Sequence, residues 1–255
     1  MSEQSQRGLP RALIAFGLLL AVGMCVAAFI LGTQVKTVGS GRQTISVKGL
    51  AEKAVQADYA EWQVGQQARG KTFAEALSNL RAIRPKLDAF IARQGFGPET
   101  VSAGQEDVEP FMIEEERPNL PPKQVQDGYL AQQTLSIRSN ALDKIAAANK
   151  AALEFKAAGN PIVYSSPAYL INDLEGVKMS LIAAATQNAQ TRAEEFVKNG
   201  NARIGAMRSA SQGAFYILRA GSSMDASDYG GTYDRSTVDK TARVVVTVEY
   251  NIVER

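Results

Sequence analysis

The densest group of carboxylates in the chain lies between residues 106 and 116, and comprises Glu106, Asp107, Glu109 and Glu114–Glu116. Paired carboxylates can carry out general acid–base catalysis, and oxygen-rich loops can bind calcium. The group lacks the Asp-x-Asp-x-Asp-Gly spacing of a calcium loop, and four prolines between residues 110 and 122 indicate a stiff, extended segment. Because runs of like charge are usually solvated, we predict a solvent- or partner-facing loop here.

A second group of chemically capable residues lies near the C-terminus, and comprises Asp225, Asp228, Tyr229, Gly230, Gly231, Tyr233 and Asp234. Such side chains and backbone carbonyls could hold calcium, but their spacing does not match a calcium loop. Gly and Asp favour turn geometry, so the segment Gly221–Asp239 is predicted to be a loop between two antiparallel strands. Its tyrosines leave an interfacial role open, because each ring has an apolar body and a polar tip.

Histidine is absent and Cys25 is the single cysteine. No Ser-His or Cys-His nucleophile, imidazole metal ligand or intrachain disulfide can therefore form. Ser–Lys catalysis remains as a route, but no Ser-x-x-Lys box occurs beside a supporting motif. The segment Gly39–Arg42 lacks the Lys-Ser/Thr ending of a phosphate loop, and Tyr59 and Trp62 fit a sheet surface or core. The sequence thus predicts no catalytic, cofactor-binding or metal-ligating residue, and a net charge of +2 argues against nucleic-acid binding.

An uncharged run of 21 residues, Ala12–Gly32, begins near the N-terminus. As a helix it would be about 31 Å long, which matches the hydrocarbon thickness of a bilayer. Arg7 and Arg11 precede it, so we expect the N-terminus in the cytoplasm. The alternative is a signal peptide cleaved near Val38–Ser40, although the apolar region of a signal peptide is usually about 7–15 residues. With a retained anchor, the chain would comprise a cytoplasmic N-terminus (residues 1–11), a transmembrane anchor (12–32), a linker (33–42) and an exported domain (43–255).

Alternation of apolar and polar residues predicts a series of strands after the linker. They lie at Thr44–Val47, Ala57–Val64, Thr100–Val108, Tyr129–Ile137, Ile162–Ile171, Ile204–Ser209, Ala214–Leu218 and Thr241–Ile252. The last strand has the most regular pattern, because one face carries Ala242, Val244, Val246, Val248, Tyr250 and Ile252.

Three amphipathic helices are predicted between these strands. The first opens with a capping box at Thr72–Glu75 and ends at Gly95, with a kink or a break at Pro85. The second begins at Asn140 with Asp143 and ends at Gly159–Pro161, and the third runs from Asp173 to Asn199. Paired strands punctuated by helices indicate an α+β fold with mostly antiparallel sheets.

The third helix has a surface of small residues that would let another element approach closely. It comprises Ala183, Ala184, Ala185, Ala189 and Ala193. This surface fits packing inside one subunit, and it also fits an interface between subunits.

In this order, the segments resemble the SIMPL-domain family of YggE-like exported bacterial proteins. The matching pieces are Ile45–Gly49, Lys71–Thr72 with Ala74–Ala76, Gly128–Tyr129, Ala189 with Arg192–Glu194, Ile204–Gly205 and Thr241–Ile252. The resemblance covers about Gln43–Val253. It implies a periplasmic or surface location, an α+β fold, ring- or channel-like homo-oligomers in some members, roles in stress tolerance and no general enzymatic activity.

We therefore expect a single-pass protein of the bacterial inner membrane, with most of the chain in the periplasm. It would act non-catalytically as a homo-oligomeric scaffold, and its partners would be its own copies and the bilayer around residues 12–32. One alternative is a monomeric envelope adaptor or binding module, linked to stress response, that holds an envelope protein through one of the two loops. A second alternative is a hydrolase that depends on Glu106, Asp107 and Glu109.

Overall fold

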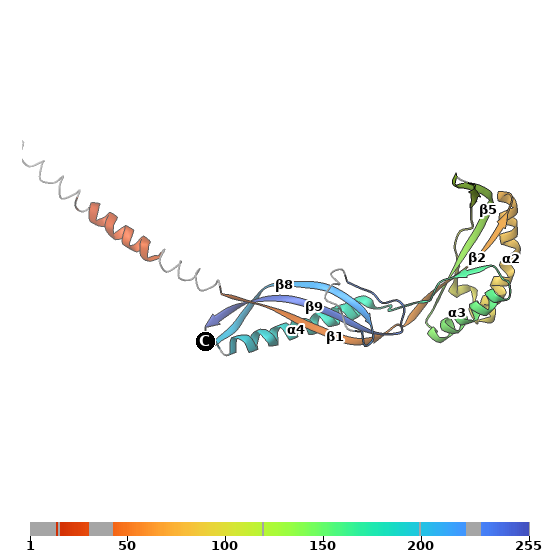
Figure 1. The fold of residues 1–255 in the computed structure, drawn as a ribbon. Helices are drawn as coiled ribbons and strands as arrows, with labels where there is room; N and C mark the ends of the chain where they lie inside the picture. Colours follow the sequence, from red (N-terminus) through yellow and green to blue (C-terminus); the bar gives the residue numbers. More distant parts are fainter. Residues whose placement is uncertain are drawn as a thin grey trace, which may run out of the picture. The chain divides into compact units, whose positions relative to one another are not determined.

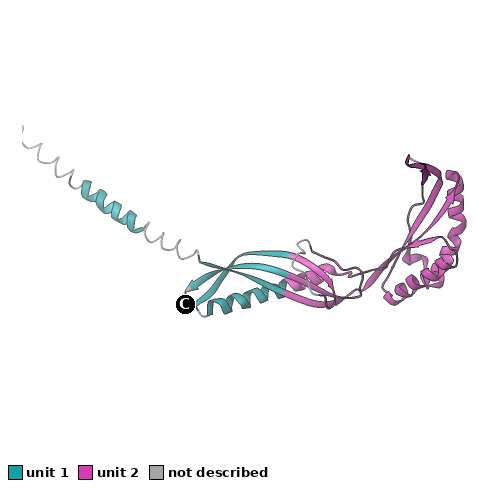
Figure 2. Ribbon diagram, viewed as in Figure 1, with its two compact units in different colours: residues 1–50, 183–213, 245–255 teal, residues 51–182, 214–244 magenta. Residues whose placement is uncertain are grey.

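The computed structural model describes residues 14, 16–30, 43–118, 120–198, 200–222 and 231–254 (Figure 1). The chain divides into two compact units, and each is built from segments that are distant in the sequence (Figure 2). Unit 1 comprises residues 1–50, 183–213 and 245–255, and unit 2 comprises residues 51–182 and 214–244. Helices and antiparallel sheets make up both units, so the predicted α+β class is confirmed.

A three-stranded sheet has the order β1-β9-β8, with β1 at Thr44–Gln56, β9 at Asp239–Glu254 and β8 at Ala202–Arg219. The alternation predicted for the last strand is confirmed, since Ala242, Val244, Val246, Val248 and Tyr250 are all buried. Two predicted strands, Ile204–Ser209 and Ala214–Leu218, are parts of the single strand β8. Each of the three strands extends past the segment in which buried and exposed residues alternate, because exposed residues at its ends or in its middle also take part in strand pairing.

The second sheet lies in unit 2 and has the order β3-β5-β2-β6, with β4 paired to β5 and β7 paired to β2. Its strands are β2 (Tyr59–Gly70), β3 (Val101–Ala103), β4 (Asp107–Arg117), β5 (Leu120–Ser139), β6 (Ile162–Tyr164) and β7 (Ala168–Leu170). The predicted strand Thr100–Val108 is instead the end of a 3₁₀ turn (Pro98–Thr100), β3 and the start of β4. The predicted strand Ile162–Ile171 is instead divided into β6 and β7.

The loop predicted for the acidic segment is wrong, because the segment forms the antiparallel hairpin β4–β5. Pro110 is accommodated because β4 is an edge strand, which pairs with β5 alone among the described strands. A register shift separates Pro110 from Met112. The distal part of the hairpin, residues 112–117 and 120–126, is exposed on both faces apart from the half-buried Val125. We call it the hairpin arm.

Helices α2 (Phe73–Arg93) and α3 (Leu142–Ala157) cover the unit 2 sheet, and their apolar faces meet Trp62, Leu135 and Ile137 in the core. The predicted cap of α2 is confirmed, since Thr72 Oγ1 accepts a hydrogen bond from Glu75 N (3.2 Å) and Glu75 Oε2 accepts one from Lys71 N (2.9 Å). Gly95 ends the helix with a φ of +82°.

Pro85 neither ends nor divides α2, so of the two predicted alternatives, a kink or a break, the break is wrong. Buried residues on both sides of it, including Leu80, Leu87 and Phe90, hold the helix against the core. Tertiary packing therefore outweighs the hydrogen bond that proline removes. The start of α3 also differs from the prediction: Ala141 is the N-cap residue and gives no side-chain hydrogen bond.

Residues 16–30 of the predicted anchor are helical, and the rest of Ala12–Gly32 other than Ile14 lies outside the described residues. Within the described part of the chain, no helix combines the length and the apolar character needed to cross a bilayer.

Candidate functional site

In unit 1, helix α4 (Leu174–Lys198) approaches the backbone of β1 at Gly49. A Cβ atom on Gly49 would lie 2.0 Å from Ala185 O and 2.7 Å from Ala189 N, so only glycine fits at this contact. Ala185, Ala189 and Ala193 are completely buried, whereas Ala183 and Ala184 are exposed. Three of the five alanines in the predicted small-residue surface therefore pack inside the chain.

Polar side chains of α4 cover part of the outer edge of β1, which pairs on its other side with β9. Arg192 Nη1 donates a hydrogen bond to Lys48 O (3.0 Å), and Leu50 N donates one to Asn188 Oδ1 (3.1 Å). Asn188 and Arg192 are four residues apart on α4 and therefore lie on the same face of the helix. Their side chains reach the backbone groups of Lys48 and Leu50, which are two residues apart on β1 and point to the same side of the strand. These contacts protect an edge that would otherwise be open to pairing.

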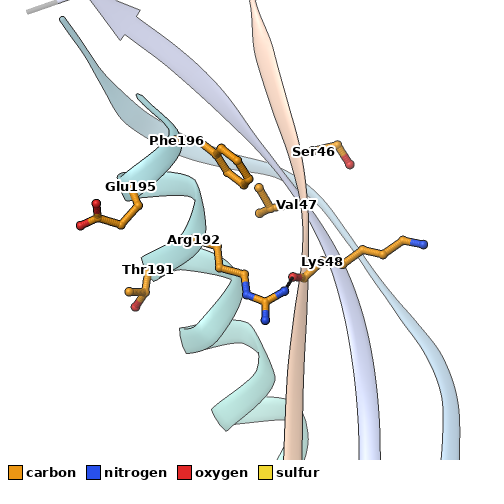
Figure 3. A pocket seen from close by; sticks show the side chains of 7 residues that line it. All are labelled: Ser46, Val47, Lys48, Thr191, Arg192, Glu195 and Phe196. Atoms are coloured by element: carbon orange, nitrogen blue, oxygen red, sulfur yellow. Dashed lines mark hydrogen bonds between the residues drawn. The ribbon is translucent and has the colours of Figure 1, made fainter. Parts of the chain in front are cut away.

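The protection of the β1 edge ends one turn further along α4. Phe196 lies at this position, and its side chain cannot form a hydrogen bond with the backbone of β1. A groove of about 720 Å³ opens between α4 and β1 at this point (Figure 3). It is lined by Ser46, Val47, Lys48, Thr191, Arg192, Glu195 and Phe196.

The groove combines an apolar wall with a strand edge. The ring of Phe196 is 69% exposed and lies over the buried Val47, while the side chains of Ser46 and Lys48 point away from the helix (Figure 3). An extended peptide could add to β1 at Ser46 and place an apolar side chain against Phe196.

The opposite edge of the same sheet is formed by β8, whose residues 206–213 are all exposed. In the described part of the chain, no strand pairs with the outer side of β8 in this region. Arg208 is the one charged residue between residues 206 and 213. Further along, in unit 2, the edge is covered, because Ile217 N donates to Thr232 O and Asp234 N donates to Ile217 O, both at 2.7 Å.

The carboxylates at residues 106–116 do not converge on one point. Glu106 forms an ion pair with Arg81 (2.7 Å), and this hydrogen-bonded contact lowers the pKa of the carboxyl. Asp107 accepts a weak hydrogen bond from Gln132 (3.5 Å) and Glu114 accepts one from Gln124 (2.9 Å). These groups therefore serve the hairpin as separate surface contacts.

The second predicted group contributes the half-buried Tyr233 and Asp234 to a cluster around the buried Lys240, whereas residues 225–230 lie outside the described residues. Lys240 Nζ donates to Asp234 O (2.5 Å) and lies 3.3 Å from Asp234 Oδ2. Ser236 and Thr237 also donate to the Asp234 carboxylate, and Tyr233 Oη accepts a hydrogen bond from Ile171 N (2.9 Å).

The environment of the cluster shifts its ionisation. Burial alone would raise the pKa of Asp234, but the hydrogen bonds from Thr237 and Ser236 and the charge of Lys240 outweigh it and hold that pKa below its usual value. Burial lowers the pKa of Lys240, and the neighbouring Asp234 opposes this shift. Burial also raises the pKa of Tyr233. A cation enclosed by its counterion in this way ties the segment to the sheet.

Lys240 was not predicted as a functional residue, although the sequence contains a signal for it. Residue 240 is in phase with the buried residues 242, 244, 246, 248 and 250 of β9, and only 1% of its surface is exposed. A lysine at a core position needs a buried counterion. Asp234, six residues earlier, was the carboxylate to consider.

The remaining predictions have simple outcomes. Trp62 is buried in the unit 2 core, where its Nε1 donates to Ser165 O (3.0 Å), and Arg138 lies over the ring of Tyr59. Cys25 is exposed on the helical segment. Among the residues that the structure describes, no group of three or more His, Cys, Asp or Glu side chains could hold a metal ion.

Comparison with known proteins gives one family. The model of the SIMPL family, described as "Protein of unknown function (DUF541)", matches residues 45–250. Curated proteins gave no match to the chain. A crystal structure of a hydrolase from Listeria innocua is 13% identical, covering 76% of this chain and 91% of its own, but its TM-score of 0.15 supports no argument about fold or activity.

Proposed function

Because the chain belongs to the SIMPL family, for which no function is established, we propose a function from its own surfaces. The protein is a non-catalytic, membrane-anchored scaffold at the cell envelope that assembles from copies of itself. The observation that carries this proposal is the long outer edge of β8, exposed from residue 206 to residue 213.

An open strand edge presents unpaired N–H and C=O groups, and proteins usually protect such edges with charges, prolines or a covering element. On β1, side chains of α4 supply this protection, whereas residues 206–213 of β8 have one arginine and mostly small side chains. Two copies of β8 can pair antiparallel about a two-fold axis and join their three-stranded sheets into one. An axis that passes between the two copies of Ala210 places Arg208 opposite Gln212, so that no like charges meet.

A two-fold contact closes at a dimer, so a ring- or channel-like scaffold needs a second contact. The hairpin arm is the surface that supports it. Met112, Ile113 and Leu120 are exposed there, on a two-stranded ribbon that has little core of its own. In the assembly these side chains contact a neighbouring copy.

The anchor is residues 12–32, which carry no charge and hold the protein in the bacterial inner membrane with the bulk of the chain in the periplasm. The described helical residues support this location, since Phe16, Leu19 and Phe29 are each at least 65% exposed. Anchoring confines copies to one surface, which raises their effective concentration and strengthens weak contacts between them.

The proposal is tested by the particle mass of the full-length protein, extracted gently in detergent and measured by light scattering with the detergent subtracted. We expect a mass several times 27.4 kDa for the natural chain and a smaller one for Ala210→Lys, because paired β8 strands bring the two lysines together. The matched control is Ala183→Lys, which adds the same charge at an exposed alanine of α4 in the same unit.

A monomeric natural chain would overturn the scaffold. An unchanged mass for Ala210→Lys, or an equal loss of mass for Ala183→Lys, would exclude β8 as the assembly edge. The groove at Phe196 favours a second candidate, a monomeric adaptor that binds an extended segment of an envelope protein. A monomer whose capture of such a protein is abolished by Phe196→Asp would support that function instead.

A further inference from the structure

A second groove lies wholly within unit 2, beside an arginine that is stacked on an aromatic ring. The Cζ atom of Arg69 lies 3.7 Å from the centre of the Phe111 ring. At this distance the guanidinium plane is held by cation–π attraction, and its N–H edges remain available to a ligand.

The pairing of three neighbouring strands brings Phe111 to this position. Leu130 of β5 pairs with both Arg69 of β2 and Glu109 of β4, so these residues share one face of the sheet. Phe111 follows Glu109 by two residues and lies on the same face, from which its ring reaches Arg69 across β5. Next to this contact the register shifts, because Phe111 is opposite two residues of β5, Asp127 and Gly128.

Within the described part of the chain, Arg69 has no ion-pair partner. None of the ion pairs formed by the described residues includes Arg69. Arg138 gives a direct comparison, because it also lies over an aromatic ring, that of Tyr59 at 5.2 Å, but pairs with Glu61. An arginine stacked on an aromatic ring can therefore also pair with a carboxylate, as Arg138 does with Glu61. In the described part of the chain, no carboxylate pairs with Arg69 in this way.

The groove has a volume of about 450 Å³. Its apolar lining comes from Ile83, Phe111, Leu130 and Pro161, and Arg69 is the one cation among its described lining residues. Asn79 lies at the rim, where its Nδ2 donates to Arg69 O (2.9 Å) and fixes the strand that carries the arginine. The site thus offers one positive charge beside an apolar space large enough for a side chain or a small ring.

We infer that this groove binds a carboxylate attached to an apolar body. The guanidinium forms paired hydrogen bonds with the carboxylate, and the body packs against Ile83, Leu130 and Phe111. A single cation matches a singly charged group. Two sources share this chemistry, namely a small organic acid and the C-terminus of a peptide that ends in an apolar residue.

The test is calorimetric titration of the full-length protein with N-acetylphenylalanine and with its uncharged amide. A peptide ending in phenylalanine, as the free acid and as the amide, distinguishes the two sources. We expect both acids to bind more tightly than about 1 mM and both amides to bind at least tenfold more weakly. A peptide acid that binds at least tenfold more tightly than N-acetylphenylalanine identifies a peptide terminus, and similar affinities identify a small acid.

Three variants separate the groove from other sites. Arg69→Gln should weaken binding of the acids about tenfold or more, and Phe111→Ala should weaken it through loss of the stack. Arg138→Gln is the matched control, because it removes a stacked arginine that already has its carboxylate, and should leave the affinity unchanged. Circular dichroism of each variant establishes that it is folded.

Absence of binding by both acids would overturn the inference, as would equal affinities for an acid and its amide. Unchanged binding by Arg69→Gln would also overturn it. None of these outcomes affects the scaffold, whose test is the particle mass.

Discussion

At the scale of single residues, the enclosed pair of Asp234 and Lys240 is the feature with the clearest energetic consequence. We predict that Asp234→Asn lowers the free energy of unfolding by about 3 kcal/mol, because it leaves the Lys240 ammonium buried without its counterion. Chemical denaturation followed by circular dichroism measures this change. Adding Lys240→Met to the variant should recover part of the loss, since the unpaired charge is then removed as well.

The same pair sets a dependence on pH. The pKa of Asp234 is lower in the folded protein than in the unfolded chain, where it is about 4. Its contribution to stability is therefore fully present above about pH 4 and is lost as the pH falls through the folded-state value. In Asp234→Asn this part of the acid destabilisation should be absent. A parallel decline of both proteins with acid would contradict the assignment.

At the scale of elements, helix α2 depends on the cap at its first turn. We predict that Thr72→Ala destabilises the protein by about 1 kcal/mol, because Glu75 N loses its acceptor. Thermal unfolding followed by circular dichroism would detect the change as a lower Tm. Thr72→Ser keeps the hydroxyl and should remain close to the natural chain, and equal losses in the two variants would exclude the cap as the cause.

Elements whose signals are local were predictable from the sequence. The caps at Thr72 and Asp173 and the alternation of β9 each depend on neighbouring residues, and the structure contains all three. The hairpin arm and the middle of β8 could not be predicted in this way, because both are exposed on their two faces and therefore lack alternation. Because the middle of β8 is exposed, the sequence pattern predicted two short strands in place of one. The hairpin arm, which is also exposed, has the polar composition typical of a loop.

The candidate sites were less predictable than the elements. The groove at Phe196 exists because two side chains of α4 meet the edge of β1 and a third, one turn later, cannot. The ring of Phe111 meets Arg69 because β2 and β4 pair with opposite sides of β5. Both sites depend on contacts between segments distant in sequence, and no spacing of residues along the chain encodes them.

At the scale of the whole molecule, the predicted anchor sets the form of the mature protein. We predict that N-terminal sequencing of the protein purified from membranes finds residues 12–32 retained, because this apolar run is longer than that of a cleaved signal peptide. A mature chain that starts near Gly39–Gly41 would contradict the anchor. It would leave the contacts proposed for β8 and the hairpin arm in place.

The two compact units differ in one further respect. The chain has a single tryptophan, Trp62, which belongs to unit 2, is completely buried and donates its indole N–H to Ser165 O. Intrinsic tryptophan fluorescence is thus a natural reporter of unit 2 alone. Its emission should shift to longer wavelength when that core opens, and should be unaffected by events confined to unit 1. Fluorescence and particle mass measured on the same sample can therefore distinguish opening of the unit 2 core from loss of assembly.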